Sequence, residues 1–217
     1  MIKGFLFDLD GVIVDTAVFH FQAWRRLAQK LGGDFTEAQN EELKGVSRVD
    51  SLKMILNWTG ATVSEEEFTE LMALKNEWYL ELVQSLDASH GLPGAVEFLQ
   101  SAHAQGIKIA LGSASKNAPM ILDKMGLTPL FDAIIDGNNV VNGKPHPEVF
   151  LKGATAIGLS PEQCVVFEDS IAGVQAAKTG GMKCVGIGTQ EALKGADIHF
   201  NALGETTPEK LVARFNV

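Results

Sequence analysis

The chain has 217 residues, of which 46% are hydrophobic and 21% charged, the profile of a globular protein with a core of ordinary size. A net charge of −9 argues against a nucleic-acid or anionic-membrane surface, since either partner needs a basic patch. Cys164 and Cys184 lie in apolar runs, so we expect core thiols in a reducing compartment and no disulfide framework. Without a transmembrane-length run or a signal-peptide pattern, the predicted location is the cytoplasm.

The first predicted element, residues 2–9, is a buried strand, and helical spacing follows it. The helical segments, with no strand candidate between them, are 17–32, 46–58 and 64–86. Thr36 and Ser64 are expected to cap helices in this region. The chain is therefore predicted to leave an α/β domain near Asp15 and to return to it near residues 90–93.

From residue 93 onward, helical and strand patterns alternate. Helices are predicted at 93–106, 116–126, 147–158 and 171–181, and strands at 107–113, 131–136, 164–169 and 182–188. Such alternation needs crossover connections and so predicts a parallel, Rossmann-like sheet. The predicted fold class is α/β, with a core domain at 1–15 and 91–217 and an inserted all-helical domain at 16–90.

Acidic side chains follow two of the predicted strands, at the carboxyl ends where parallel sheets bind ligands. Asp8 and Asp10 follow the first strand, and Glu168 and Asp169 end the fourth. An Asp-x-Asp pair suits a nucleophilic carboxylate with a second acid, although Asp10 with Gly11 is also a common turn pair. Four carboxylates at one edge would repel each other without a divalent cation, so we predict one Mg²⁺ per site, held by these four residues.

Two further segments offer groups that bind an anion. Ser113 and Ser115 follow a strand and precede a helix, whose first free amides are donors for an anion. A plain serine N-cap explains the same pattern equally well. Lys144 precedes Pro145 in an extended turn, where a lysine could neutralise a phosphoryl group or the cluster of acids.

The helical segment adds two patterns of its own. His20 and Trp24 are four residues apart and share one helical face, which is also what the segment's own apolar stripe would produce. Lys44 and Arg48 lie in a stretch without acids, residues 43–49, of an otherwise acidic segment. Such a basic island is consistent with a second anion site or with ordinary surface cations at a helix start.

The motifs DLDGV, GSAS, GKP and ED occur in the order and approximate spacing of the haloacid dehalogenase superfamily, and the chain resembles that family of phosphotransferases. The resemblance implies that Asp8 is phosphorylated and that Asp10 is the general acid/base. It implies that Ser113, Ala114 and Lys144 bind the phosphoryl oxygens, and that the final acids hold Mg²⁺. It also implies that the core is the catalytic domain and that the helical insert is a mobile cap domain that determines substrate specificity.

Within the superfamily, the patterns D-T-A-x-x-H-F-x-A-W, L-K-G-V-S-R-x-D-S-L and S-A-S-K-N resemble those of the β-phosphoglucomutase family. By that resemblance, Thr16 lies at the hinge and orients Asp10, while His20 relays cap closure to it. The cap residues implied to contact the sugar phosphate are Trp24, Lys44, Gly45, Val46, Arg48, Ser51 and Lys75. The core residues implied to line the phosphate site are Ser115, Lys116 and Asn117.

The resemblance implies interconversion of β-D-glucose 1-phosphate and D-glucose 6-phosphate, with glucose 1,6-bisphosphate as intermediate and primer. Two other functions stay open. A Mg²⁺-dependent phosphatase or pyrophosphatase acting on a small phosphate ester would share every core residue and differ in water access. The intact Asp8 and Asp10 speak against a non-catalytic sugar-phosphate-binding protein. We expect a monomer that binds a small sugar phosphate, and neither nucleic acid nor a membrane.

Overall fold

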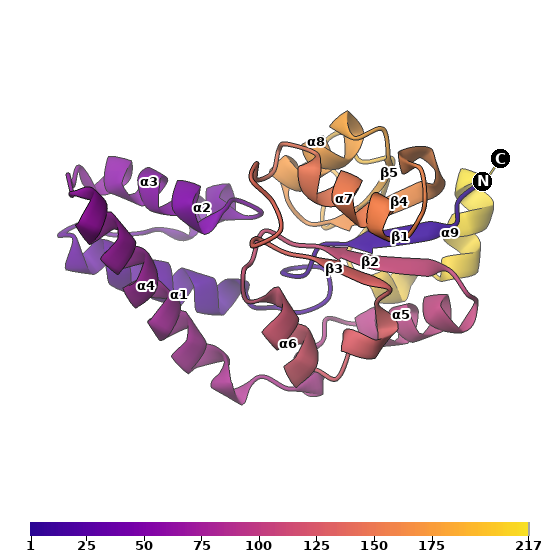
Figure 1. Ribbon diagram of the computed structural model, residues 1–217, viewed down its shortest axis with the longest axis horizontal. Coiled ribbons are helices and arrows are strands. Elements are labelled where there is room, and N and C mark those ends of the chain that lie inside the picture. Colours follow the sequence, from indigo (N-terminus) through magenta and orange to yellow (C-terminus); the bar gives the residue numbers. More distant parts are fainter. Residues whose placement is uncertain (217) are drawn as a thin grey trace.

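The computed structural model describes residues 1–216, which form two parts lying side by side (Figure 1). One part is built around a parallel sheet and is called the α/β part below. The other, residues 17–82, consists of four α-helices and is called the helical block. The two parts correspond to the predicted core and helical insert.

The sheet of the described chain has six strands in the order β3-β2-β1-β4-β5-β6, and every neighbouring pair is parallel. The strands are β1 Gly4–Phe7, β2 Lys108–Gly112, β3 Ala133–Ile135, β4 Cys164–Glu168, β5 Lys183–Ile187 and β6 Ile198–Phe200. This confirms the predicted parallel, Rossmann-like sheet. In register, Phe7 lies beside Leu111 of β2 and Phe167 of β4, so the residue after β1 is placed between the ends of two neighbouring strands.

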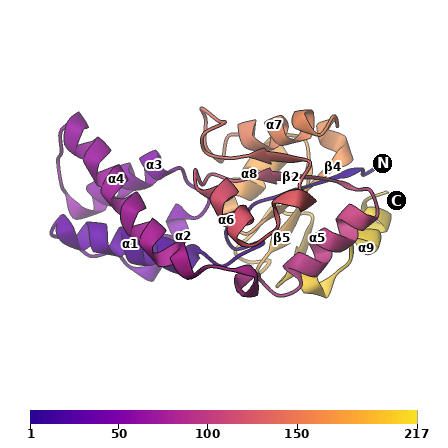
Figure 2. The same ribbon diagram turned by 60° about the horizontal axis from the view of Figure 1, so that its bottom comes forward.

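Helices cover both faces of the sheet because successive side chains of its strands point to opposite faces. Phe5 and Phe7 pack on the face covered by α5 and α9, whereas Leu6 packs on the face covered by α7 and α8 (Figures 1 and 2). The helices of the α/β part are α5 Ala95–Ala104, α6 Ala118–Lys124, α7 Glu148–Ala156, α8 Ile171–Thr179 and α9 Pro208–Phe215.

The helical block has a hydrophobic core of its own, which includes Trp24, Leu27 and Leu52. Its helices are α1 Ala17–Lys30, α2 Glu37–Leu43, α3 Arg48–Thr59 and α4 Glu65–Leu82. Thr36 and Ser64 cap α2 and α4 as predicted, each in a capping box. Single 3-10 turns occur at η1 Val83–Ser85, η2 Ala88–His90, η3 Thr128–Leu130, η4 Pro161–Gln163 and η5 Leu203–Glu205.

The two connections between the parts run side by side. Val14 forms a β-bridge with Gly91, and the Leu92 N–H donates to the Ile13 carbonyl oxygen at 2.9 Å. These paired segments lie next to the boundaries predicted near Asp15 and residues 90–93, and the division into two domains there stays a prediction. These two paired segments connect the helical block to the sheet.

Strand β6 and helix α9 were not predicted, and of α2 only the N-cap residue Thr36 was predicted. Helix α2 has seven residues with Leu43 alone buried, so it shows no apolar periodicity. Strand β6 has three half-buried residues at the sheet edge. The cysteines are buried and unpaired in the sheet, as expected. Within residues 1–216, no helix combines the length and apolarity needed to cross a membrane.

Candidate active site

Four segments of the α/β part deliver polar side chains to the carboxyl end of the sheet. Asp8 follows β1, Ser113 follows β2 and Glu168 ends β4. Lys144, from the loop between β3 and α7, donates hydrogen bonds to Asp8 Oδ1 and to Glu168 Oε1. The structure thus brings together the strand-end residues that the sequence placed at one edge.

The ion cluster formed by Asp8, Lys144 and Glu168 is buried. Although burial opposes it, the two carboxylates raise the pKa of Lys144, so the lysine is charged at neutral pH. Glu168 Oε2 accepts from the Ser170 backbone N–H at 2.8 Å and from the Ser170 hydroxyl at 2.9 Å. Both carboxylate oxygens of Glu168 therefore accept hydrogen bonds. With this geometry, Glu168 positions the Lys144 ammonium group next to Asp8.

The two aspartates of the first motif differ in their surroundings. Burial raises the pKa of Asp8 to about 6, with Lys144 opposing the rise and Glu168 adding to it. Burial, and then the charge of Asp8, raises the pKa of Asp10 to about 7. A carboxyl group with a pKa near neutrality can both accept and return a proton, which is what general acid/base chemistry requires.

Asp169 lies against the turn that follows Asp8. A Cβ atom on Gly11, whose φ is +78°, would lie 2.1 Å from Asp169 Oδ2, so glycine is needed at that position. Burial and the charges of Glu168 and Asp8 raise the pKa of Asp169 well above its usual range. The ionised pair Asp8 and Asp169 is therefore costly without a compensating charge.

This donor set fits Mg²⁺, a hard cation that takes carboxylate oxygens and water. Among residues 1–216, no three His, Cys, Asp or Glu side chains are arranged to hold a metal without other ligands. Asp8 and Asp169 are the carboxylates best placed to bind the ion. Direct ligation by Asp10 and Glu168 stays a prediction, and for Glu168 it competes with the bonds described above.

A cleft separates the sheet edge from the helical block and holds about 770 Å³ of empty space, counting the part that opens to solvent. Both parts of the molecule line it. The lining residues of the α/β part are Asp8, Asp10, Ser113, Ala114, Ser115, Lys116 and Asp169. Those of the helical block are Ala17, His20, Trp24, Asn40, Leu43, Lys44, Gly45, Val46, Arg48, Ser51 and Lys75.

Four residues of the predicted site lie outside the lining of this cleft. Lys144 and Glu168 form the buried support of Asp8. Thr16 is wholly buried at the start of α1. Asn117 turns to the helical block, where its Nδ2 donates to Asn76 Oδ1 of α4 at 2.9 Å.

The helical block lines the cleft with three basic side chains, namely Lys44, Arg48 and Lys75. Lys75 is buried, with its Nζ 2.8 Å from His20 Nδ1 and 4.6 Å from the centroid of the Trp24 ring. Burial and the charge of Arg48 lower the pKa of Lys75 well below its usual range. In the described chain, no carboxylate lies within 4.0 Å of Lys75 or Arg48. Cations placed in this way stabilise a bound anion.

The loop between α2 and α3 rests on the sheet edge. Lys44 Nζ lies 3.8 Å from Asp169 Oδ2 and 2.9 Å from Glu41 Oε2. A Cβ atom on Gly45, whose φ is +71°, would lie 2.6 Å from Ser170 Oγ, so the backbones approach closely there. The helical block is thus seated on the strand ends, and the cleft lies between them.

Comparison with known proteins now identifies the family. Residues 2–181 match the family model described as haloacid dehalogenase-like hydrolase. The chain belongs to this family. The strand-end motifs and the inserted helical block are thereby those of a haloacid dehalogenase-like enzyme, and the enzyme is a phosphotransferase.

The relatives include mutases and phosphatases. The β-phosphoglucomutase of Bacillus subtilis is 40% identical over 211 residues, which cover 96% of this chain and 93% of that protein. The crystal structure of β-phosphoglucomutase from Clostridium difficile superposes with a TM-score of 0.96 at 40% identity, covering 100% of this chain and 98% of the other. The fructose-1-phosphate phosphatase of Escherichia coli is 34% identical over 187 residues, covering 85% and 95% of the two chains.

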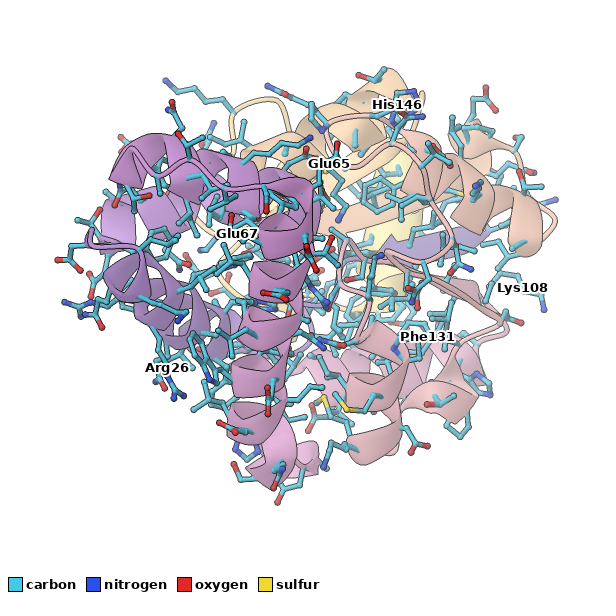
Figure 3. All side chains as sticks on the ribbon, turned by 60° about the vertical axis from the view of Figure 1, so that its left-hand side comes forward. Arg26, Glu65, Glu67, Lys108, Phe131 and His146 are labelled. Atoms are coloured by element: carbon cyan, nitrogen blue, oxygen red, sulfur yellow. The ribbon has the colours of Figure 1, made fainter. Side chains whose placement is uncertain are left out.

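Sequence reasoning missed three residues that line the cleft, Ala17, Asn40 and Leu43, and three more that lie next to the site. Ser170 precedes a helix and could have been found as an N-cap. Tyr79 lies four residues after Lys75 on α4, a spacing that places both on one helical face. Asn76 had no signal, because its partner is distant in sequence. His146, two residues after Lys144, lies on the outside of the molecule (Figure 3).

Proposed function

We propose that this enzyme is a β-phosphoglucomutase that interconverts β-D-glucose 1-phosphate and D-glucose 6-phosphate through phospho-Asp8 and glucose 1,6-bisphosphate. The observation that carries the proposal is a cleft lined at the sheet edge by Asp8 and in the helical block by Lys75 and Arg48, which have no carboxylate partner among residues 1–216. A mutase holds two phosphates at once, whereas a simple hydrolase needs one phosphate site. The 40% identical mutases supply the expectation of a glucose phosphate.

Asp8 is the proposed nucleophile. Lys144 donates to Asp8 Oδ1, so we expect Oδ2 to attack the phosphorus atom. As the bond between Oδ2 and phosphorus forms, the bond to the sugar oxygen breaks, and the sugar leaves as an alcohol. Lys144, Ser113 and the backbone at Ala114 then face the oxygens of the transferring group, where negative charge is spread in the transition state.

Asp10 is the proposed general acid/base. It takes the proton of the sugar hydroxyl that attacks phospho-Asp8 and returns a proton to the sugar oxygen that leaves in the second transfer. Between the two transfers the bisphosphate turns round, so that each phosphate in turn lies at Asp8. The second phosphate is then held by Arg48, Ser115 and Lys116.

Mg²⁺, when bound by Asp8 and Asp169, would supply positive charge that offsets the carboxylates and the transferring phosphoryl group. Lys44 lies near the same carboxylate of Asp169 and is the cation that the helical block adds there. We predict that chelation abolishes turnover and that added Mg²⁺ restores it. Full activity in metal-free buffer would contradict this part of the proposal.

Residues 16–90 are proposed to move as a cap about the paired strands at Val14 and Gly91. Closing the cap excludes water, so that phospho-Asp8 reacts with a sugar hydroxyl and is not hydrolysed. His20, which lines the cleft next to Lys75, belongs to the surface that closes over Asp10. A cytoplasmic location and a monomeric state are part of the same proposal.

A second candidate is a phosphatase that acts on a small sugar phosphate. It is favoured by the fructose-1-phosphate phosphatase of Escherichia coli, which is 34% identical to this chain. Such an enzyme would use the same Asp8, Asp10 and Lys144. It would differ in admitting water to phospho-Asp8, and its substrate would not need a second phosphate site.

The test is turnover of the two anomers of glucose 1-phosphate, each with and without glucose 1,6-bisphosphate primer. We expect glucose 6-phosphate from the β anomer alone, with a lag that the primer removes. Asp8→Asn should form no phosphoenzyme and no product. Release of inorganic phosphate as the main product would instead identify the phosphatase.

A further inference from the structure

A turn that follows the edge strand β3, residues 136–139, packs against the segment that carries the predicted phosphate-binding residues, 113–117. Strand β3 pairs with β2, so the turn and the segment leave the sheet side by side (Figure 1). The pairing continues beyond the strands, because the Ser113 N–H donates to the Ile135 carbonyl oxygen at 3.0 Å. The turn has no part in the mechanism proposed for phosphoryl transfer.

The turn holds the segment by the carbonyl oxygens of its backbone. The Gly137 N–H donates to the Ser115 carbonyl oxygen at 3.4 Å, and Asn138 Nδ2 donates to the Lys116 carbonyl oxygen at 3.3 Å. Asn138 is itself held by Asp136, whose carboxylate accepts from the Asn138 backbone N–H at 2.7 Å and from Asn138 Nδ2 at 3.2 Å. Because Asp136 is buried, these bonds stabilise one conformation of the turn.

Gly137 lets the turn and the segment approach each other closely. A Cβ atom at this position would overlap the Ala114 carbonyl oxygen and lie 3.0 Å from Lys116 Cγ. Gly137 has no positive φ, so no left-handed backbone conformation calls for glycine there. Glycine is therefore needed at this position for the close contact with the segment and not for the geometry of the turn.

These contacts orient the backbone N–H of Lys116. In a trans peptide the C=O and N–H bonds point in opposite directions, so the bond from Gly137 to the Ser115 carbonyl oxygen directs the Lys116 N–H away from the turn. Among residues 1–216 this N–H has no acceptor, whereas the Ser115 N–H donates to Ser113 Oγ and the Asn117 N–H donates to Ser115 Oγ. Because Lys116 lines the cleft, its N–H is available to an anion bound there.

We propose that Gly137 is a positioning residue for the second phosphate, acting through the peptide bond between Ser115 and Lys116. The inference rests on the proposed function and deepens it, because there Ser115 and Lys116 hold the phosphate that is not being transferred. Gly137 keeps the Lys116 N–H directed at this phosphate, and Asn138 supports the next peptide through the Lys116 carbonyl oxygen. A side chain at position 137 would turn the peptide and weaken its charge-assisted hydrogen bond to phosphate.

The first test is the steady-state kinetics of Gly137→Ala and Asn138→Ala, with Asn142→Ala as the matched control. Asn142 lies in the same loop, and its side-chain amide donates one hydrogen bond to Glu148 Oε2 and none to residues 113–117. For Gly137→Ala we expect the KM for β-D-glucose 1-phosphate to rise by roughly 10-fold, because a charge-assisted hydrogen bond is weakened. For Asn138→Ala, which loses one neutral hydrogen bond, the rise should be about 2- to 5-fold. The kcat should change by less than about 3-fold, since the second phosphate is bound alike in the ground and transition states. Asn142→Ala should keep the wild-type KM.

Two further measurements separate positioning from support of the fold. Phosphorylation of Asp8 by acetyl phosphate, which has a single phosphate, should change by less than about 3-fold in Gly137→Ala. In protein labelled with ¹⁵N-lysine, the amide signal of Lys116 is identified by its absence from Lys116→Arg. On addition of glucose 6-phosphate we expect this amide proton to shift downfield in the wild-type enzyme, because it gains a hydrogen bond to phosphate. Gly137→Ala should lose most of that shift.

A wild-type KM or an unchanged Lys116 shift in Gly137→Ala would overturn the positioning role, and so would the absence of the shift from the wild-type enzyme. Equal losses of Asp8 labelling and of sugar-phosphate turnover would also overturn it, because the turn would then only support the fold. Failure of the proposed function is seen separately, as release of inorganic phosphate from β-D-glucose 1-phosphate without formation of glucose 6-phosphate. The Lys116 shift does not depend on that result, because it reports binding of glucose 6-phosphate and not turnover.

Discussion

At the scale of single residues, charge pairing separates two kinds of lysine and arginine in this enzyme. Lys144 is buried between Asp8 and Glu168 and forms an ion pair with each of them. Lys75 and Arg48 face the cleft without a carboxylate partner in the described chain. We propose that the first kind stabilises the folded protein and that the second kind binds an anionic ligand. Substitution should therefore affect the two kinds in opposite ways.

Arg48→Ala should lower kcat/KM for the mutase reaction by about 10- to 150-fold, the worth of a charge-assisted hydrogen bond to phosphate. Phosphorylation of Asp8 by acetyl phosphate, which has no distal phosphate, should barely change. Tm should not fall, because Arg48 leaves no protein carboxylate unpaired. Arg25→Ala, which removes an exposed partner of Asp34, is the control. A parallel loss of both reactions would make Arg48 structural.

Lys144→Met should destabilise the fold by about 3–5 kcal/mol, because Asp8 and Glu168 would be left buried without a cation. Thermal unfolding in metal-free buffer measures the effect. Lys108→Met, which removes a half-exposed partner of Asp132, is the matched control and should cost less than about 1 kcal/mol. Equal losses of Tm in the two variants would show that the buried cluster contributes no special stability.

At the scale of elements, the helical block touches the α/β part through a few polar contacts. Asn76 of α4 accepts from Asn117, which precedes α6, and Lys44 of the α2–α3 loop lies near Asp169. These contacts join segments of the two parts that are distant in sequence. They are thus placed to favour the seated position of the block without fixing it there.

Asn76→Ala should remove one hydrogen bond between the parts and so raise the fraction of enzyme with the block open. We expect hydrolysis of phospho-Asp8 to quicken by about 2- to 10-fold relative to its transfer to sugar, as for a bond of about 0.5–1.5 kcal/mol. The exposed Asn57→Ala on α3 is the control. Rapid-quench measurement of both rates decides. An unchanged ratio would mean that the Asn76–Asn117 bond does not contribute to closure.

At the scale of the whole molecule, the sequence predicted the sheet, the insert and the edge at which the strand-end motifs meet. Those features follow from local patterns: apolar strand runs, helical spacing, and acids such as Asp8 placed directly after a strand. The extent of helix α2 and strand β6 was not predicted, because neither element has enough buried positions to produce a periodic hydrophobic pattern. Most cleft residues expected from the family resemblance do line the cleft, whereas Lys144 and Asn117 face other partners.

What local patterns could not supply was contact between distant segments. Asn76 meets Asn117, and Gly45 meets Ser170, through the seating of one part on the other. The two residues of each pair lie in different elements, so no periodic pattern in the sequence indicates that they are in contact. The buried hydroxyl of Tyr79 is a further example, because only the folded structure shows that it lacks a hydrogen-bond partner among residues 1–216.

The central claim is that the cleft directs phospho-Asp8 to a sugar hydroxyl because its second cationic site holds a second phosphate. The most direct measurement is a single-turnover partition. Enzyme phosphorylated at Asp8 by labelled acetyl phosphate is mixed with β-D-glucose 1-phosphate and Mg²⁺ and then quenched. We predict that most of the label appears in glucose 1,6-bisphosphate. Label found mainly as inorganic phosphate, at a rate independent of the sugar phosphate, would contradict the account.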